Sequence, residues 1–427
     1  MATHAETRAL PYGMGHFNIG WLVAIVALFA LFALGLVAYS RQITEGEIVT
    51  SMRDVGPMGG APWGLYIAFE LYAVGVGFGA LLLLGVIRIG GFAHLRPLSR
   101  TLGLITLVSL IIGYLSVIAD VGQPVRAMIN IARYARPISP FSGTFTIGLI
   151  LSLSLTWVYF YLESRKDAAI LARRATAWSG WLRFIAAGYG SSPGAEARHR
   201  RSSLALAAII LAVGVAAASS SGFVFGMQVA RPGWFGALQA PGFVTLAAVT
   251  ATGVLLIIAA VLRKVLAEGD RLDMRVFGWL SNLLTGLTLA YIYFLPAELI
   301  TAGYGARLAE SRITEELLTG HYAWMFWLSG ASFVAAFAIG GTQALRRRHS
   351  LPLILVAAVL VNVAAMIKRC LIVVPSLTHG NLLPYPTGSY GPTWVEYSVI
   401  VGLVALAALL YVLFMKVFPI MDVQEEN

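Results

Sequence analysis

Ionisable side chains within or at the ends of long apolar runs are the residues of this sequence best suited to chemistry. Glu70 lies inside the run WGLYIAFELYAVGVGFGALLL, Asp120 and Glu298 lie at the ends of two other runs, and Lys368 and Arg369 lie inside a fourth. A charged group in a bilayer costs at least about 2–3 kcal/mol, so such groups are paired, in contact with internal water, or functional. Carboxyl groups placed in this way can exchange protons with a bound molecule, which makes proton transfer the first chemistry to consider.

The composition assigns these residues to a polytopic membrane protein. Of the 427 residues, 58% are hydrophobic and only 12% are charged, with a mean hydropathy of +0.79, whereas a soluble protein of this length needs far more polar surface. The formal charge of +10 comes from basic residues in loops between apolar runs, which is a topology signal and argues against nucleic-acid binding. The lone Cys370 excludes a disulfide framework and an iron–sulfur cluster held by this chain alone.

Ten apolar segments, each long enough to cross a bilayer as a helix, predict an all-α integral membrane protein. The first segment has no small-residue cleavage site, so we expect it to remain as a helix. Lys and Arg are concentrated on the side that holds both termini, which predicts cytoplasmic termini in a bacterial inner membrane. The segments lie at residues 18–39, 63–87, 99–120, 141–162, 204–226, 240–262, 276–300, 322–342, 351–375 and 393–418.

Two stretches between these segments have the pattern of surface helices. The longest loop, residues 163–203, is basic and contains RRATAWSGWLRFIAAGYG, which is typical of an interfacial amphipathic helix, although a solvated loop that sets the topology explains it equally well. On the outer side, PVRAMINIARYARP (Pro124 to Pro137) places apolar residues at helical spacing opposite three arginines. This pattern predicts a short helix lying on the outer surface.

A weak internal repeat relates two parts of the chain. PWGLYIAF opens the second apolar segment and RPGWFGAL leads into the sixth, and an acidic residue follows the tryptophan after 57 residues in one case and 64 in the other. We expect two pseudo-symmetric four-helix bundles, made of helices two to five and six to nine, with helices one and ten outside them. The predicted units are residues 1–62, with the first helix and an outer loop; 63–230, the first bundle; 231–376, the second bundle; and 377–427, with the last helix.

The helix directions bring polar residues together near the outer side of the first bundle. Glu70 lies about 10 Å below the outer end of its helix at 1.5 Å per residue, and Asp120 lies near the same surface, where the next helix ends. Gly75 and Gly79 allow close helix packing around them. The other polar residues expected at this depth are Tyr66, Tyr114, Thr144, Ser219, Ser220 and Ser221.

The second bundle has its own set of charged residues at the same depth. Lys368 and Arg369 require a carboxylate or a water-filled pocket, and Glu298 is the carboxylate best placed to supply the pairing. Structural explanations also exist for the buried acids. Glu70 can be a protonated carboxyl group bonded to a neighbouring helix, Asp120 an interfacial residue, and Glu298 one half of a static ion pair with Arg369.

Several chemistries are excluded by missing residues. None of the seven histidines lies in the middle of an apolar run, which argues against bis-histidine haem ligation within the membrane. The sequence also shows no metal-ligand spacing, nucleotide-binding loop or nucleophile elbow. Redox chemistry here would therefore use a diffusible quinone, with a carboxylate as the base that takes the protons of a quinol.

Five pieces of sequence resemble the NrfD-like family, the polysulfide reductase membrane subunits. They are WGLYIAFE, IADVGQP, SSSGFVFGMQVARPGW, FLPAELI and MIKRCLIVVPSLTHGNLLPYPTGSYGPTWVEY, and they follow the family order along nearly the whole chain. The chain looks most similar to the ten-helix branch found in hydrogenase-2, the Dsr complex and alternative complex III. It departs from some relatives, which have a histidine where this chain has Ala217 and Ala218, or Glu-Arg where it has Lys368 and Arg369.

The resemblance implies a quinone site in the first bundle, close to the periplasmic face, and no haem or iron–sulfur cluster in this chain. It implies menaquinone or ubiquinone as the cofactor, and as partners a periplasmic ferredoxin-like iron–sulfur subunit with a further redox subunit. Glu70 and Asp120 would contact or deprotonate the quinol, and proton passage would use Glu298, Lys368 and Arg369. The candidate quinone-binding residues are Trp63, Tyr66, Tyr114, Arg126, Thr144, Ser219 and Ser220.

The sequence thus favours a quinol-interacting membrane subunit of a respiratory oxidoreductase complex, inactive alone and embedded in membrane lipid. It would oxidise or reduce a membrane quinone and exchange electrons with the iron–sulfur partner. The direction of electron flow, the quinone type and proton translocation across the membrane stay open. A proton-coupled secondary transporter is the alternative, because repeated bundles with intramembrane acids also suit transport. A membrane anchor with a vestigial site is a third interpretation.

Overall fold

The computed structural model describes residues 14–421 apart from 16, 52–61, 135, 137, 140–142, 175–177, 191, 267–271, 306–307, 380–387 and 389, and it leaves out the side chains of residues 131, 132, 144–146 and 174. The described part of the chain is helical and contains no β-strand. Ten of its helices are long and apolar enough to cross a membrane. The predicted class, an all-α integral membrane protein, is confirmed.

The spans and the shorter helices alternate along the chain. The spans are α1 (Ile19–Glu45), α2 (Leu65–Ile89), α3 (Leu98–Asp120), the π-helix η5 (Thr144–Leu151) continued by α6 (Ser152–Arg174), α8 (Pro193–Gly226), α9 (Gln239–Val265), α10 (Met274–Tyr304), α12 (Ala323–Leu345), α13 (Leu351–Thr378) and α14 (Trp394–Val417). The shorter helices are η2 (Glu47–Val49), η4 (Ala93–Leu95), α4 (Pro124–Tyr134), α7 (Ser179–Ala186) and α11 (Leu308–Leu318).

Capping residues explain where several spans begin. Asn18 Oδ1 accepts a hydrogen bond of 2.7 Å from a backbone N–H in the first turn of α1. Ser192 caps α8 directly before Pro193, and a proline at this position loses no helical hydrogen bond. Thr393 and Glu396 form a capping box at the start of α14. Each cap binds backbone donors that the first helical turn leaves unpaired.

The structure corrects the longest predicted loop, residues 163–203. α6 continues to Arg174 and α8 begins at Pro193, with α7 between them. Charged residues end the apolar pattern at the membrane surface, but Glu, Lys, Arg and Ala are good helix formers, so the helices continue into the polar region. The predicted helix within Pro124 to Pro137 is confirmed as α4, whereas the sequence did not predict α11.

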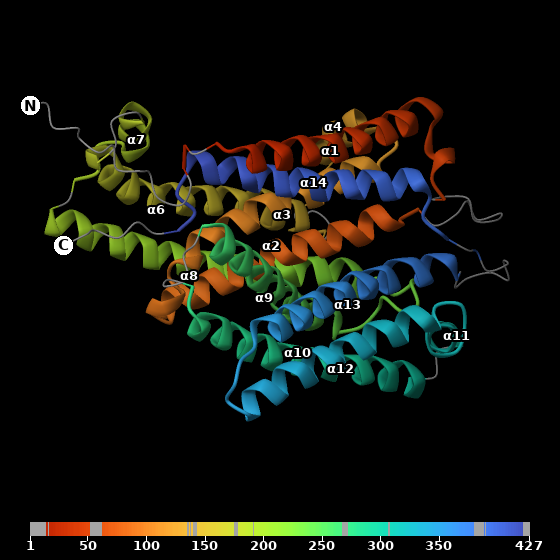
Figure 1. Cartoon of the computed structure of the whole chain (residues 1–427). Coiled ribbons are helices and arrows are strands. Elements are labelled where there is room, and N and C mark those ends of the chain that lie inside the picture. Colours follow the sequence, from red (N-terminus) through yellow and green to blue (C-terminus); the bar gives the residue numbers. More distant parts are fainter. Residues whose placement is uncertain are drawn as a thin grey trace, which may run out of the picture.

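The spans pack as two groups of four with one additional pair. α2, α3, α6 and α8 contact each other in a ring, which we call the first group, and α9, α10, α12 and α13 form a second ring, the second group. The groups meet where α2 and α8 contact α9 and where α2 contacts α13. Figure 1 shows α1 beside α14 along one edge of the molecule, where α14 contacts α3. The residue limits of the predicted units and their pseudo-symmetry remain predictions.

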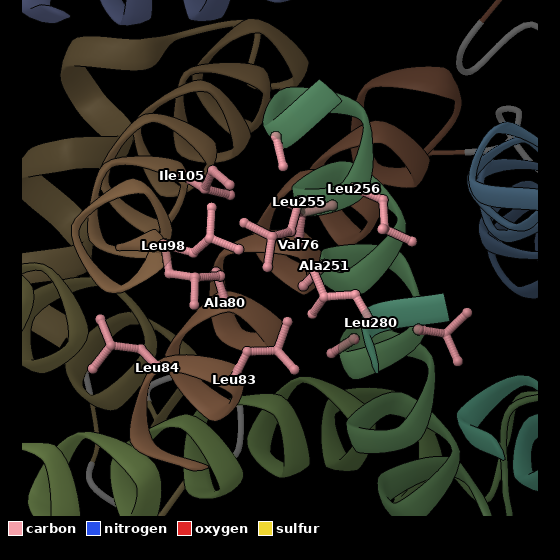
Figure 2. Close-up of a cluster of buried hydrophobic side chains, with 14 of the residues drawn as sticks. Val76, Ala80, Leu83, Leu84, Leu98, Ile105, Ala251, Leu255, Leu256 and Leu280 are labelled. Atoms are coloured by element: carbon pink, nitrogen blue, oxygen red, sulfur yellow. The ribbon is translucent and has the colours of Figure 1, made fainter. Parts of the chain in front are cut away.

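Close packing of α2 on α9 joins the two groups. A Cβ atom at Gly79 would overlap the backbone of Ala247, so only glycine allows this approach. Around this contact, side chains of α2, α3, α9 and α10 form a continuous apolar core (Figure 2). The expectation that Gly79 permits close helix packing is confirmed.

Successive spans run in opposite directions. Hence α3, α8, α10 and α13 end on the side of the molecule where α2, α9, α12 and α14 begin (Figure 1). We call this side the Asp120 end and the opposite side the Arg100 end, after residues near the end and the start of α3.

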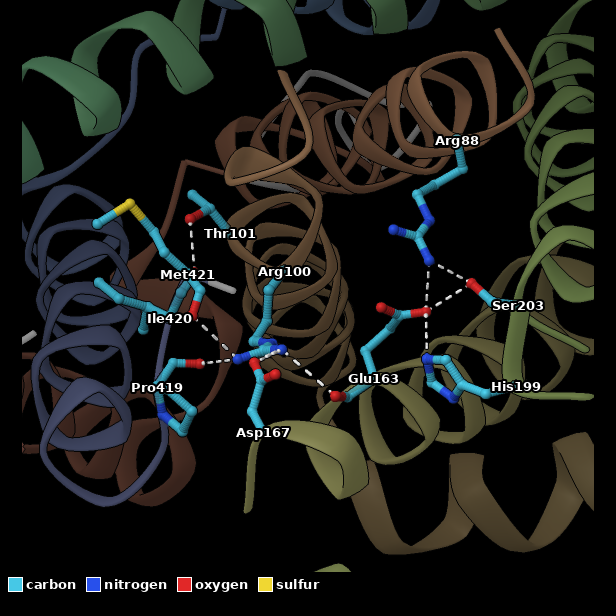
Figure 3. Close-up of polar contacts among 10 residues, drawn as sticks. All are labelled: Arg88, Arg100, Thr101, Glu163, Asp167, His199, Ser203, Pro419, Ile420 and Met421. Carbon is cyan, nitrogen blue, oxygen red and sulfur yellow. Dashed lines mark hydrogen bonds and ion pairs between the residues drawn. The ribbon is translucent and has the colours of Figure 1, made fainter. Parts of the chain in front are cut away.

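Buried charges at the Arg100 end are paired with each other (Figure 3). Arg100, only 2% exposed, forms an ion pair with Asp167 and donates to the backbone carbonyls of Pro419 and Met421. These bonds attach the segment that follows α14 to α3 and α6. A buried guanidinium needs such acceptors on several sides, because its burial is otherwise very costly.

A second cluster at the same end joins α2, α6 and α8 (Figure 3). Arg88 Nη2 lies 2.6 Å from Glu163 Oε1, and Ser203 Oγ donates to the same oxygen at 2.5 Å. His199 Nε2 lies 3.9 Å from it. The buried carboxylates of these two clusters, Asp167 and Glu163, thus both have cationic partners, which indicates a structural role.

Candidate functional site

A cavity of about 110 Å³, the first cavity, lies among α2, α3 and α8 at the Asp120 end. Its polar lining consists of Glu70, Tyr114, Asp120 and Ser221, and apolar side chains including Trp63 complete the wall. Of the described residues that line it, none is Lys or Arg. The structure therefore brings four sequence candidates, Trp63, Glu70, Tyr114 and Asp120, to one place.

Helical spacing explains how each helix presents its residues to this cavity. Trp63, two residues before α2 begins, precedes Glu70 by seven positions, and Ile67 on α2 precedes it by three. Tyr114 and Asp120 are separated by six positions on α3. Separations of three and seven return to nearly the same helix face, because a turn takes 3.6 residues, whereas six positions place Tyr114 and Asp120 about 120° apart around α3. Each helix thus lines this internal space with residues from successive turns.

The two acids of the first cavity are deeply buried. Glu70 is 6% exposed and Asp120 is 4% exposed. Among the described residues, none forms a hydrogen bond or a salt bridge with the Glu70 carboxyl group. A carboxyl group in such a place can exchange a proton with a molecule in the cavity.

The nearest cation to Glu70 approaches from another helix. Arg369 on α13 stacks its guanidinium over the Phe243 ring at 3.9 Å from the centroid, and a Cβ atom at Gly75 of α2 would lie 3.5 Å from its Nη2. Arg369 thus lies between the two groups of helices and contacts the helix that carries Glu70.

Two of the predicted quinone-binding residues lie away from the cavity. The Tyr66 hydroxyl donates to Gln42 Oε1 at 2.8 Å, toward α1. Arg126 is exposed on α4 and does not line the cavity. The Tyr66 ring packs in an apolar cluster with residues of α1, α3 and α14.

Of the three serines on α8 that were expected at this depth, the one that lines the cavity is not one of the two predicted to bind quinone. Ser219 and Ser220 are half-buried and do not line the cavity, whereas the buried Ser221 does. Thr144 is the first residue of η5, and its side chain lies outside the described residues. A π-helix is rare and often marks a functional position.

A buried carboxylate that was not predicted from the sequence lies near the N-terminus of α2. Glu396 is fully buried and accepts a hydrogen bond from the Tyr390 hydroxyl and from the backbone N–H groups of Thr393, at 2.9 Å, and Ser51, at 3.3 Å. Tyr390 also accepts from Leu65 N at 2.6 Å, and burial raises the pKa of Tyr390. The Thr-x-x-Glu spacing before an apolar run was the available signal.

A larger cavity of about 640 Å³, the second cavity, lies in the second group at the Asp120 end. It is formed by residues 233–239, α10, α11 and α13, with Phe326 of α12. Its charged lining residues are Glu298, Glu310 and Lys368, and Gln239 and Ser376 add neutral polar groups. None of the predicted first-bundle residues lines it.

The predicted partner of the Lys-Arg pair is found in this second cavity. Lys368 Nζ lies 2.6 Å from Glu298 Oε2, so the carboxylate pairs with the lysine and not with Arg369. The two basic side chains diverge because neighbouring residues are about 100° apart around a helix. Lys368 faces the second cavity, and Arg369 faces α2 and α9.

Metal chemistry finds no support in the described part of the chain. There, no group of three or more His, Cys, Asp or Glu side chains is arranged to hold a metal ion. The two cavities instead combine apolar walls with a few polar groups, which is the usual composition of a site for an organic molecule.

Comparison with known proteins gives one family. The family model described as Polysulphide reductase, NrfD, matches residues 55–379. This range includes the linings of both cavities and every site residue predicted from the sequence, from Trp63 to Arg369.

Three proteins are similar to this chain over nearly its whole length. A protein of Halobacterium salinarum, named as a membrane subunit of dimethyl sulfoxide reductase, is 28% identical over 97% of this chain and 94% of its own. A selenate reductase subunit of Mesobacillus selenatarsenatis is 24% identical over 96% and 95% of the two chains. The Hdr-like menaquinol oxidoreductase integral membrane subunit of Archaeoglobus fulgidus is 22% identical over 94% of each chain.

Proposed function

We propose that this chain, which belongs to the NrfD polysulphide reductase family, is the quinone-interacting membrane subunit of a redox complex. The observation that carries the proposal is the first cavity, where two buried carboxyl groups and a tyrosine face an apolar space with no lining cation among the described residues. The names of the relatives, two reductase subunits and one menaquinol oxidoreductase subunit, are consistent with this role.

The chemistry proposed for the first cavity is proton exchange with a quinol. Oxidation of a quinol to a quinone breaks two O–H bonds and releases two protons and two electrons. Glu70 takes a proton from the hydroxyl group that it binds, and Asp120, at the end of α3, passes protons toward water. The electrons leave to a partner subunit, and reduction of a quinone is the same reaction in reverse.

The size of the first cavity limits what it holds. About 110 Å³ is less than the roughly 300–1,000 Å³ of a typical small-molecule pocket. The cavity would therefore receive the ring of a quinone between Trp63 and Tyr114, while the isoprenoid tail lies outside it. Tyr114 and Ser221 supply hydroxyl groups that can bind the second oxygen of the ring.

The orientation and the partner follow from the charge distribution of the loops. With the basic loops in the cytoplasm, the Asp120 end faces outward. A periplasmic iron–sulfur subunit docked over this end would lie close to the first cavity and could receive the electrons. α4 lies at the same end with Val125, Met128 and Ile129 exposed, so it is a candidate element of that docking surface.

Binding of a fluorescent alkyl-hydroxyquinoline N-oxide, a quinol analogue, to the purified complex tests the proposal. We expect Glu70→Gln to weaken binding about tenfold, which corresponds to roughly 1.4 kcal/mol. Glu45→Gln is the matched control, because Glu45 is an exposed acid at the end of α1 and pairs with Arg41. Unchanged affinity in Glu70→Gln, in a complex shown intact by gel filtration, would contradict a quinol site at Glu70.

A further inference from the structure

The second cavity is lined by helices that correspond in chain order to those that line the first. The first cavity lies among α2, α3 and α8, and the second is lined by the start of α9 and by α10 and α13, with α11 added outside the group of four. In chain order these are the first, second and fourth helices of each group. Trp63 and Trp234, the tryptophans of the internal repeat, stack at 5.7 Å between ring centroids where the groups meet. The two cavities thus lie in two groups of helices that meet at this pair of stacked tryptophans.

The charges of the second cavity select against an anionic ligand. Two carboxylates, Glu298 and Glu310, face one ammonium group, Lys368, and Glu298 already matches that ammonium at 2.6 Å. Glu310 is held near residue 233, where its Oε2 accepts from the backbone N–H of Gly233 at 2.8 Å. A phosphate or a fatty-acid carboxylate would meet this negative excess, whereas a neutral molecule would not.

Polar groups in the second cavity suit a ligand that carries oxygen atoms. Ser376 is 1% exposed, and its Oγ has no hydrogen-bond partner among the described residues. A buried hydroxyl group without a partner costs free energy that a ligand oxygen can recover. Lys368 Nζ has three donors, of which the bond to Glu298 uses one.

Two prolines shape the cavity wall. Pro296 lies inside α10, two residues before Glu298, and Pro375 lies inside α13, next to Ser376. A proline removes one backbone hydrogen bond and bends a helix, and proline-interrupted spans often mark a binding site in membrane proteins built from repeats. Both interruptions coincide with the lining of the second cavity.

We propose that the second cavity binds a second quinone-class molecule, a neutral aromatic ring with two oxygen atoms and an apolar tail, which it holds without oxidising. Its ligand class rests on the proposed function. At about 640 Å³, the second cavity has the volume of a complete small-molecule pocket. Glu298 does not act as the base there, because Lys368 already matches its charge.

Photolabelling locates the two sites separately. The purified complex is irradiated with an azidoquinone, and the labelled peptides are identified by mass spectrometry. We expect labels on α2 or α8 from the first cavity and on α10 or α13 from the second. Leu299→Trp fills the second cavity and should lower the label on α10 and α13 about tenfold, the effect of roughly 1.4 kcal/mol of lost binding. The matched control is Ile300→Trp, because Ile300 is its neighbour, is 69% exposed and does not line the cavity.

The outcomes separate this inference from the proposed function. Labels confined to α2 and α8, unchanged by Leu299→Trp, would overturn the second site and leave the first intact. Labels confined to α10 and α13 would support the second site and refute the first. Equal loss of label in Leu299→Trp and Ile300→Trp would show a general disturbance of α10 and overturn the second site. Competition by a phospholipid but not by an unlabelled quinone would also overturn it, in favour of lipid.

Discussion

The two cavities are lined by helices in corresponding chain order but differ in whether a cation bonds to Glu70 or to Glu298. In the first, Glu70 and Asp120 face an apolar space of about 110 Å³ without a lining cation among the described residues. In the second, Glu298 lies 2.6 Å from Lys368 inside about 640 Å³. The same helix arrangement can therefore present an acid that is able to take a proton, or an acid whose charge is already matched.

The pairing of carboxylates with arginines also separates the Arg100 end from Glu70. There, Asp167 and Glu163 are bonded to Arg100 and Arg88, and the bonds join the ends of helices. No cavity is needed to explain these carboxylates. A buried acid in this protein has a structural role where an arginine bonds to it, and a chemical role is proposed for the acids that line the first cavity.

The largest expected effect is on catalysis in the first cavity. We expect Glu70→Gln to lower the rate of quinol oxidation by about a thousandfold, because the loss of a general base typically costs 10²–10⁴ in rate. The charge-matched double variant Glu298→Gln with Lys368→Met should leave the rate within about threefold of the wild type, roughly 0.7 kcal/mol. Steady-state assays of the complex measure both. Equal losses of rate in the two variants would contradict the proposed difference between the two cavities.

The next effect is on stability in the second cavity. Lys368→Met leaves Glu298 as a half-buried charge without its partner, so we expect a loss of about 2 kcal/mol, which adding Glu298→Gln should largely restore. Unfolding of the purified chain in detergent, followed with increasing denaturant, measures both variants. If the double variant is as unstable as the single one, the ion pair is not what Lys368 contributes.

A smaller effect is expected at Asp120. Asp120→Asn should lower the rate of quinol oxidation about tenfold, roughly 1.4 kcal/mol, because Asp120 passes on protons and Glu70 accepts them first. Asp167→Asn at the Arg100 end is the contrasting variant, since it breaks a buried ion pair and should lower stability while the surviving protein keeps its rate. A greater catalytic loss at Asp120 than at Glu70 would reverse the order of the two acids.

The smallest effects are expected from single hydroxyl groups. Tyr114→Phe should weaken binding of the quinol analogue in the first cavity by roughly two- to fivefold, because one hydrogen bond contributes about 0.5–1 kcal/mol. Ser376→Ala should produce a similar decrease in azidoquinone labelling of the second cavity only. Titration and photolabelling of both variants test whether each hydroxyl acts on its own cavity. If Tyr114→Phe lowered the labelling of the second cavity, or Ser376→Ala weakened binding in the first, the two sites would not be independent.

Much of the fold could be predicted from the sequence, because membrane spans depend on local composition. Ten long apolar segments were sufficient for the helical class and its ten spans. The predicted ends of the helices were less accurate than their number. In residues 163–203, for example, the helices continue past the point where the apolar pattern stops. α11 has a polar sequence outside any span, so hydropathy provided no signal for it.

The sequence by itself determined which residues were candidates and at which end of the spans they lie. An acid inside an apolar run is costly wherever the helix packs, so Glu70, Asp120 and Glu298 stand out from composition and position along the chain alone. The topology predicted from the sequence also placed Glu298 near Lys368, and the 2.6 Å distance between Glu298 Oε2 and Lys368 Nζ confirms that expectation.

Only the tertiary structure decided which face of each helix meets a cavity. Ser221 lines the first cavity and Ser219 and Ser220 do not, while Tyr66 turns toward Gln42. Neighbouring residues differ by about 100° around a helix, so a rotation of the helix exchanges one serine for the next. That rotation is set by packing between helices that are distant in the sequence, such as α2 against α9. The sequence carries the chemical groups, and the packing determines which of them share a cavity.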